Sequence, residues 1–362
     1  MKAAVLREAH KPLSVEDVDV ADPIGHEVLI RTAAAGVCHS DVHFQQGLYT
    51  CEMPAVLGHE SAGIVEAVGP DVTYVKPGDH VITCLSVFCG HCRYCTTGRP
   101  NLCEDRESTQ RKETDAPRLS RDGETFFQFA NLSSYAEQLL VHEHAVCKIR
   151  EDMPLDKAAL IGCGVTTGVG AVLNTAKVEP GSTVAVIGCG GIGLSAIQGA
   201  RIGGAGRIIA VDTISSKLQL AKELGATDLV NARDGDPVEQ VMDLTGGGVA
   251  YSFEAVGLKE TAEQAFRMLE VGGTATIIGM IPQGTKIELT GHDFLRERKL
   301  QGSSMGSNRF RVDMPRYVDM YLTGNLKLDE MITRNIKLDE INDGFEALLK
   351  GEVARQIIMF DV

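Results

Sequence analysis

The stretch that decides the fold reads T-V-A-V-I-G-C-G-G-I-G and covers residues 183–193. It begins as a β-prone, mostly apolar run and passes through glycines into residues 192–200, which carry helical periodicity. A G-x-G-x-x-G pattern between a strand and a helix is typical of a turn that holds a pyrophosphate, because glycines permit the tight turn and the close approach of phosphates to the helix N-terminus. The residues predicted to bind a dinucleotide are Gly188, Gly190, Gly191, Ile192 and Gly193.

The next predicted strand ends on an acid that indicates which dinucleotide binds. Asp212 lies nineteen residues beyond Gly193. A carboxylate at this place accepts hydrogen bonds from both ribose hydroxyls and repels a 2′-phosphate, so it favours NAD over NADP. Lys217, one turn further on, is a candidate to hold the ribose from the other side. The alternative is a glycine-rich turn that binds nothing.

The nucleotide turn belongs to a longer strand-and-helix alternation that starts near residue 180. Such an alternation predicts a doubly wound parallel sheet with crossover helices. The expected strands are residues 183–187, 207–211, 249–254 and 274–279, and the expected helices are residues 192–200, 217–224 and 260–270, with Gly225 and Gly272 as helix C-caps. The first 150 residues are rich in Gly and Pro between short β-prone runs, which predicts an irregular, mostly antiparallel β-domain. After about residue 304 the chain is expected to return to that first domain.

Composition excludes several other classes of protein. The chain has 362 residues, 35 Lys plus Arg and 49 Asp plus Glu, for a formal charge of -14. This acidic balance argues against nucleic acid or an acidic membrane surface as a partner. No run approaches the ~20 uninterrupted apolar residues of a spanning helix, and the N-terminus lacks the apolar core of a secretion signal. We therefore expect a soluble, cytoplasmic protein.

Four of the ten cysteines lie within fifteen residues and predict a metal site. Cys89, Cys92, Cys95 and Cys103 form a C-x2-C-x2-C-x7-C set. Four thiolates close a tetrahedron and leave no open position, which is typical of structural zinc. An iron–sulfur cluster is an alternative, although its usual local continuation is a three-residue gap followed by Cys-Pro. Unmetallated thiols are the third possibility.

Three scattered segments carry the candidate catalytic residues. Residues 38–43 read C-H-S-D-V-H, residues 58–60 read G-H-E, and residues 162–164 read G-C-G. Two thiolates and one imidazole are a ligand set of catalytic zinc, with a fourth position left for water or substrate. Taken singly, each cysteine or histidine here can also be an ordinary core residue.

Taken together, these segments, the four cysteines and the glycine-rich turn resemble the zinc-dependent medium-chain alcohol dehydrogenases, in particular the long-loop, class I- and class III-like bacterial branch. The resemblance covers essentially the whole chain. It implies a GroES-like, mostly β catalytic domain built from residues 1–164 and 305–362, with a zinc lobe at residues 89–103. A Rossmann domain at residues 165–304 binds NAD in this scheme, and each subunit holds two zinc ions.

The resemblance also implies roles for individual residues. Cys38, His59 and Cys163 match the catalytic zinc ligands. Glu60 matches an acid behind the metal, and Asp41 matches the carboxylate that orients the zinc-bound histidine. Ser40 and His43 match a proton relay from the substrate oxygen to solvent. Further matches are Thr167 to a nicotinamide contact, Arg355 and His39 to pyrophosphate contacts, and Tyr49, Leu85 and Phe129 to the substrate pocket.

The expected reaction is hydride transfer between a small primary alcohol, aliphatic or aromatic, and NAD, with the aldehyde as product. His39 stands where many members have arginine, so cofactor binding is expected to be weaker and more sensitive to pH. In the branch that oxidises a glutathione adduct of formaldehyde a cationic loop residue holds the adduct, whereas this chain has Tyr49 and Glu107 at the matching positions.

Several alternatives stay open at this point. Residues 104–125 are expected to form a long exposed loop, and Arg106, Arg111, Arg118 and Arg121 within it are either solvated or bind a different thiol adduct. A nicotinoprotein with permanently held NAD and a non-enzymatic NAD-binding redox sensor are the other readings. A homodimer is expected, with a tetramer as the alternative.

Overall fold

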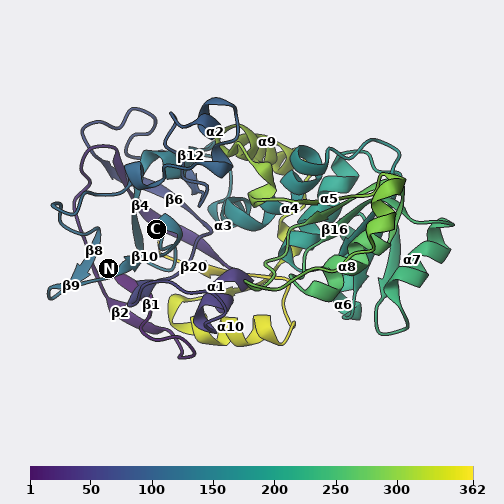
Figure 1. Ribbon diagram of the computed structural model, residues 1–362. Coiled ribbons are helices and arrows are strands. Elements are labelled where there is room, and N and C mark those ends of the chain that lie inside the picture. Colours follow the sequence, from purple (N-terminus) through teal and green to yellow (C-terminus); the bar gives the residue numbers. More distant parts are fainter. Residues whose placement is uncertain (362) are drawn as a thin grey trace. The chain divides into compact units, whose positions relative to one another are not determined.

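The structure is a computed structural model and describes residues 1–361. The chain divides into two compact units (Figure 1). The first consists of Met1–Cys163, Arg309–Gly324 and the C-terminal segment that starts at Ile332, and the second of Gly164–Asn308 and Asn325–Met331. The chain therefore enters and leaves the second unit twice.

The first unit is built mainly from antiparallel strands. Its strands are β1 (Lys2–Leu6), β2 (Ser14–Asp17), β3 (Asp19–Val20), β4 (Glu27–Val37), β5 (Ala55–Val56), β6 (Ser61–Val68), β7 (His80–Thr83), β8 (Leu119–Arg121), β9 (Glu124–Thr125), β10 (Phe127–Gln128), β11 (Gln138–His142), β12 (Val146–Lys148), β19 (Ile332–Ile336) and β20 (Arg355–Met359). Its α-helices are α1 (His39–Gln45), α2 (Arg93–Thr96), α3 (Leu155–Leu160), α9 (Phe310–Leu322) and α10 (Ile341–Leu349). A seven-stranded sheet of order β12-β7-β6-β4-β20-β19, with β11 also on β4, carries the site described below, because α1 follows β4 directly and residues 57–60 join β5 to β6.

The second unit contains a six-stranded parallel sheet of order β15-β14-β13-β16-β17-β18. This order is that of the doubly wound dinucleotide-binding fold. The strands are β13 (Thr183–Ile187), β14 (Arg207–Asp212), β15 (Asp228–Asn231), β16 (Val249–Glu254), β17 (Leu269–Ile277) and β18 (Lys299–Gly302). The α-helices are α4 (Thr166–Gly170), α5 (Gly191–Ile202), α6 (Ser215–Leu224), α7 (Pro237–Thr245) and α8 (Lys259–Arg267). The predicted fold class is confirmed.

One local prediction in this unit is wrong. Gly225 follows α6 with a φ of 126°, as predicted for a helix C-cap. Gly272, however, lies inside β17, and α8 ends at Arg267. The apolar spacing of α8 continues through Leu269 and Val271, which already belong to the strand. Gly272, with its φ of 82°, lies at an irregularity in the pairing of β16 with β17. The apolar spacing alone could not separate the end of the helix from the start of the strand.

The segment 104–125 also departs from the expectation of a solvated loop. Arg111 donates through Nε and Nη2 to Glu27 at 2.9 and 2.6 Å, and Arg118 donates through Nε to the same carboxylate at 2.7 Å. Glu27 and Arg118 are buried, and Leu119–Arg121 pairs with its neighbours as a strand. Two of the four loop arginines are therefore bound to an internal carboxylate, so they are not available to a substrate.

We predict that Glu27→Gln destabilises the protein by about 3 kcal/mol, because it leaves two largely desolvated guanidinium groups without their counter-charge. Burial alone would raise the pKa of Glu27, but hydrogen bonds from Arg111 and Arg118 outweigh it and hold the pKa below its ordinary value of 4.5. The carboxylate therefore stabilises the fold above that value, and this stabilisation is lost as the pH falls through the lowered pKa. Urea unfolding at pH 7 and pH 3 measures both effects; an equal free energy of unfolding for variant and wild type at pH 7 would contradict the assignment.

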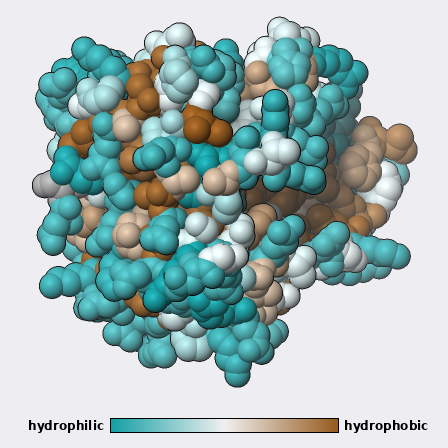
Figure 2. Space-filling view, turned by 90° about the vertical axis from the view of Figure 1, so that its left-hand side faces the viewer, coloured by the Kyte–Doolittle hydropathy of each residue, from teal (hydrophilic) through white to brown (hydrophobic). Residues whose placement is uncertain are grey.

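The helical run Leu155–Ala176 has the length and apolar composition of a membrane-spanning helix, but 83% of its most apolar window is buried inside the protein. It therefore has the properties of a core helix. The face shown in Figure 2 is mainly hydrophilic, with hydrophobic residues scattered among polar ones, as expected for a chain with a formal charge of -14.

Candidate active site and zinc sites

The first unit brings four potential metal ligands together in its interior. Cys38 caps the N-terminus of α1, His59 and Glu60 precede β6, and Cys163 lies in the helical turn Ile161–Val165. One donor atom from each of the four side chains lies within 4.8 Å of all the others, and all four residues are buried. Two sulfurs, one imidazole nitrogen and one carboxylate oxygen in such a group form a donor set that suits zinc.

A second set of residues holds the imidazole of His59 in place. Asp41 Oδ1 lies 3.1 Å from His59 Nδ1 and accepts a hydrogen bond from Gly58 N at 3.1 Å. Tyr135 donates its hydroxyl proton to the other carboxylate oxygen, Asp41 Oδ2, at 2.8 Å. The chain can approach Tyr135 this closely only because residue 58 is glycine: its φ is +91°, and a Cβ there would lie 2.6 Å from the Tyr135 ring. The second ring nitrogen of His59 is thereby left for a metal.

The protonation of this cluster also suits a cation. The pKa of Cys38 lies well below its ordinary value, chiefly because Cys163 donates a hydrogen bond to it, and the pKa of Cys163 is correspondingly raised. Burial alone would lower the pKa of His59, but Asp41 and Cys38 outweigh it and raise that pKa. In this structure the buried thiolate of Cys38 is balanced by protons on its neighbours Cys163 and His59. A bound zinc ion would take over the role of those protons.

Of the two carboxylate oxygens of Glu60, the fourth member of this group, only one has a hydrogen-bond partner among residues 1–361. Burial raises the pKa of Glu60 to about 7, although Arg355 opposes the shift. Arg355 Nη2 donates to Glu60 Oε1, whereas Glu60 Oε2 is buried and has no hydrogen-bond partner among residues 1–361. Gly36 makes room for this pair, since a Cβ there would lie 2.5 Å from Glu60 Oε1. An unpaired carboxylate oxygen among sulfur and nitrogen donors fits a metal ion.

The predicted relay and pocket residues lie on and around α1. Ser40 Oγ is 3.6 Å from Cys38 Sγ. The ring of His43 lies 5.0 Å from His39 and 6.1 Å from Tyr49, measured between centroids. Phe129 lies 6.0 Å from the His59 ring and 4.7 Å from Phe44. Phe129 therefore lies beside a member of the cluster, and Phe44, which was not predicted from the sequence, contacts both Phe129 and Tyr49.

Leu85 is placed differently. It is partly buried and packs against a hydrophobic cluster that contains Val28, Val65, Val81 and Leu132. The cluster belongs to the core of the β-sheet, so the packing of Leu85 is explained without a substrate.

The nucleotide turn of the second unit has the geometry of a phosphate cradle. Gly188 has a φ of +93°, and a Cβ on Gly193 would lie 1.7 Å from Gly188 O, so both positions require glycine. Gly190 caps α5, and a Cβ there would meet nothing within 4 Å, which leaves open space in front of the helix. Asp212 ends β14 and accepts hydrogen bonds from Cys189 N at 2.7 Å and from Ile214 N at 2.9 Å. The cradle and the acid therefore lie side by side, as a dinucleotide requires.

Two further residues predicted to contact the cofactor belong to this unit. Thr167 is buried in α4, and its hydroxyl lies 3.3 Å from the sulfur of Met305. Lys217 lies in the first turn of α6, which follows β14.

The four clustered cysteines converge as their spacing predicts. The donor sulfurs of Cys89, Cys92, Cys95 and Cys103 all lie within 4.8 Å of one another. Three of the separations are 3.5, 3.9 and 3.9 Å. With zinc–sulfur bonds of ~2.3 Å, a tetrahedron has sulfur–sulfur edges of roughly 3.8 Å. The lobe therefore has the size of a four-thiolate zinc site.

Comparison with known proteins identifies the family. Residues 25–151 match the family model described as alcohol dehydrogenase GroES-like domain, and residues 191–322 match the model described as zinc-binding dehydrogenase. The class-3 alcohol dehydrogenases of Pisum sativum and Drosophila melanogaster are each 42% identical to this chain, over 99% of its length and 97% of theirs. The chain belongs to the zinc-dependent medium-chain alcohol dehydrogenases. It is therefore an oxidoreductase of the alcohol dehydrogenase type.

Solved structures of family members have the same fold. A zinc-binding-domain alcohol dehydrogenase from Burkholderia ambifaria superposes with a TM-score of 0.95 at 36% identity, covering 100% of this chain and 99% of that one. Benzyl alcohol dehydrogenase from Acinetobacter calcoaceticus superposes with a TM-score of 0.94 at 33% identity, covering 99% of both chains.

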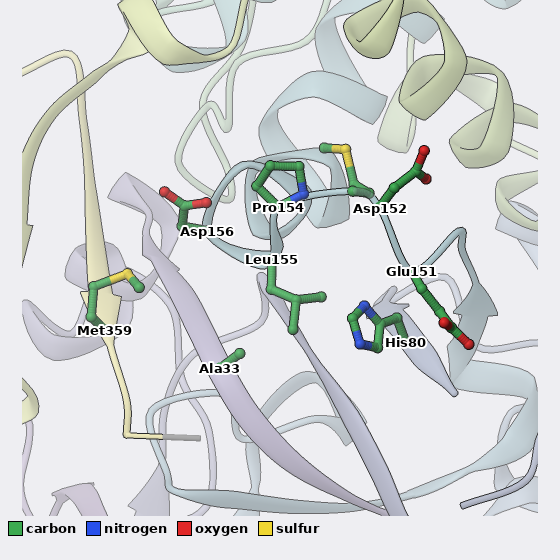
Figure 3. A pocket seen from close by; sticks show the side chains of 9 residues that line it. Ala33, His80, Glu151, Asp152, Pro154, Leu155, Asp156 and Met359 are labelled. Atoms are coloured by element: carbon green, nitrogen blue, oxygen red, sulfur yellow. The ribbon is translucent and has the colours of Figure 1, made fainter. Parts of the chain in front are cut away.

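The surface pocket in Figure 3 is separate from this chemistry. It has a volume of about 360 Å³, and Leu155 lies in it between Met359 and His80. No residue of the three metal-binding groups found among residues 1–361 of this alcohol dehydrogenase lines it. The candidate site is therefore chosen by the convergence of its donor atoms and not by the volume of this pocket.

We predict that Tyr135→Phe in this dehydrogenase weakens zinc binding at the cluster by about 10-fold, because Asp41 Oδ2 loses the hydrogen bond that fixes the carboxylate behind His59. Chelator competition followed by zinc analysis measures the change. Tyr74→Phe is the control: it also removes one tyrosine hydroxyl, that of the half-buried Tyr74, which accepts from Lys148 N at 3.2 Å. Equal zinc affinities for both variants would contradict a positioning role for Tyr135.

Proposed function

We propose that this enzyme interconverts primary alcohols, aliphatic or aromatic, and their aldehydes by hydride transfer to and from NAD, with two zinc ions per chain. The observation that carries the proposal is the buried convergence of Cys38, His59 and Cys163 within 4.8 Å. In this proposal these three residues hold the catalytic zinc, and the four cysteines of the lobe hold the structural one. Zinc supplies a Lewis acid that makes an alcohol oxygen acidic near neutral pH.

The residues around the cluster orient the metal ligands and carry the proton of the substrate hydroxyl to solvent. Asp41 and Tyr135 orient His59, and Glu60 offers its unpaired oxygen to the same space. Ser40 and His43 lie three residues apart on α1 and carry the substrate proton outward. Burial, and then the neighbouring His39, lower the pKa of His43, so its ring is neutral at pH 7 and able to accept a proton. Its buried Nδ1 has no hydrogen-bond partner among residues 1–361.

The second unit supports NAD as the cofactor. The cradle around Gly190 is open, and the carboxylate of Asp212 at the end of β14 opposes a 2′-phosphate. Thr167, Lys217, His39 and Arg355 complete the proposed cofactor contacts. Of these, Arg355 is buried against Glu60, so its first role in this chain is to balance that carboxylate.

The aromatic side chains favour an aromatic or larger aliphatic alcohol. Phe44 and Phe129 meet edge to face, and Tyr49 lies 5.7 Å from Phe44. These rings form an aromatic group that reaches His59 through Phe129, and such a group suits a benzylic ring or an alkyl chain. The similarity to a benzyl alcohol dehydrogenase agrees with this.

A second candidate substrate is a thiol adduct of formaldehyde. The 42% identity to class-3 alcohol dehydrogenases favours it. Against it, Arg111 and Arg118 are bound to Glu27, and Arg106 donates to Asn101 O at 3.0 Å.

The test is a panel assay of reduction of NAD and NADP by ethanol, longer alkanols, benzyl alcohol, and formaldehyde with and without glutathione. We expect the highest kcat/KM for benzyl alcohol or a longer alkanol with NAD. Activity that requires glutathione would replace the proposed substrate with the thiol adduct, and a preference for NADP would contradict the role of Asp212. NAD that survives extensive dialysis would identify a nicotinoprotein.

We also propose that the enzyme is a cytoplasmic homodimer. β18 is the last strand of the parallel sheet, and the preceding turn exposes Phe294 by 46% and Leu295 by 80%. An unpaired strand edge flanked by exposed apolar residues favours pairing with a second copy. Light scattering on the purified protein tests this: twice the chain mass is expected, and a monomer would contradict it.

A further inference from the structure

A third group of metal-binding side chains lies on the four-cysteine lobe. Cys89, His91 and Asp105 each place one donor atom within 4.8 Å of the other two. His91 Nε2 lies 2.9 Å from Asp105 Oδ2, and the two side chains are 66% and 41% exposed. Cys89 also belongs to the four-thiol set, so the two groups share one sulfur.

The sulfur that the two groups share, Cys89 Sγ, accepts hydrogen bonds from the backbone. Backbone amides of His91 and Cys92 both donate to Cys89 Sγ, at 3.4 and 3.3 Å. Two backbone N–H groups are therefore directed at the sulfur that the inner and outer groups share. Sulfur, imidazole nitrogen and carboxylate oxygen are all ordinary zinc ligands. His91 and Asp105 are thus two solvent-facing donors attached to a sulfur of the inner site.

Once zinc fills the four-cysteine site, the metal has no open position for another ligand. Four thiolates complete the tetrahedron, so zinc leaves only if sulfur ligands are replaced one at a time. A nitrogen and an oxygen next to Cys89 can take the places of departing sulfurs while Cys89 stays bound. In the inward direction each arriving thiol gives its proton to water as it displaces His91 or Asp105.

We propose that Cys89, His91 and Asp105 form a transient zinc site through which the four-cysteine lobe exchanges its metal with solvent. The inference rests on the proposed four-cysteine zinc site. Because His91 and Asp105 lower the barrier between the empty and the filled lobe without being ligands in either state, they change the rates of zinc entry and exit equally and leave the affinity unchanged.

The experiment compares His91→Gln and Asp105→Asn with Glu104→Gln. Glu104→Gln neutralises the carboxylate next to Asp105 but removes no member of the donor group, so it is the matched control. All three are made in full-length Cys163→Ser protein, in which the lobe is expected to hold the one remaining zinc. The rate of exchange with isotopically labelled zinc is measured by mass spectrometry, and the zinc affinity by chelator competition.

We expect His91→Gln and Asp105→Asn to slow exchange by about 10-fold with the affinity unchanged, and Glu104→Gln to do neither. Unchanged exchange rates would overturn the inference alone. Faster exchange with weaker binding would also overturn it, because it would show that His91 and Asp105 only stabilise the filled lobe. A lobe that holds no zinc in the parent protein would overturn the proposed zinc site together with this inference.

Discussion

Cys163→Ser is expected to lower kcat/KM by at least about 1000-fold and to remove one zinc ion per chain, while NAD binding is retained. A serine hydroxyl stays protonated near neutral pH and does not replace a thiolate as a zinc ligand, so the Lewis acid is lost, and each ~1.4 kcal/mol of transition-state stabilisation is tenfold in rate. NAD binding is retained because the nucleotide turn lies in the other unit. Steady-state kinetics, zinc analysis and calorimetric titration with NAD measure the three quantities.

Cys147→Ser is the control for this variant. Cys147 is also a buried thiol of the first unit, but its sulfur lies 3.8 Å from Phe310 O and belongs to none of the metal-binding groups of residues 1–361. It is expected to keep both zinc ions and most of the activity. Full turnover by Cys163→Ser would contradict the assignment of the catalytic ligands.

Cys95→Ser is expected to remove the other zinc ion and to destabilise the first unit by at least about 3 kcal/mol. Structural zinc bound by small domains contributes on the order of 10 kcal/mol to their folding, and only part of that is lost here because the lobe is a fraction of the unit. At ~2–4 °C per kcal/mol for a domain of this size, the melting temperature falls by roughly 6–12 °C. Residues 88–106 are expected to become sensitive to proteases.

Cys51→Ser provides the comparison, since Cys51 is a half-buried thiol outside the donor groups. Calorimetry and limited proteolysis with zinc analysis distinguish the two variants. If Cys95→Ser kept its zinc and melting temperature, the four-cysteine site would be wrong. If the wild-type protein contained iron and absorbed visible light, the four cysteines would be assigned to an iron–sulfur cluster instead of zinc.

Local signals allowed the sequence to predict the second unit. β13 and β16 have the predicted bounds, because each is a short β-prone run ended by glycine or acid, and the turn at Gly188 follows from neighbours in the chain. β15, α7 and β18 were missed, since short or polar elements give a weak periodic signal. The misplaced Gly272 shows the same limit at a boundary between helix and strand.

Contacts between residues far apart in the chain could not be predicted from the sequence. Tyr135 is 94 residues from Asp41, and Arg355 is 295 residues from Glu60. Neither separation follows a pattern from which the contact could be predicted. The burial of Arg111 and Arg118 against Glu27 was missed for the same reason, because a charged segment reads as solvated until its counter-charge is located. The residue types in the three segments indicated a catalytic zinc, but the assignment of Cys38, His59 and Cys163 as its ligands came from the family resemblance.

The proposed reaction requires a catalytic zinc ion in addition to the structural one. The most direct test is elemental analysis of the purified wild-type protein, with the metal content referred to the concentration of chains. Two zinc ions per chain are predicted, one of which disappears in Cys163→Ser and the other in Cys95→Ser. A single zinc ion per chain that disappears only in Cys95→Ser would contradict the account.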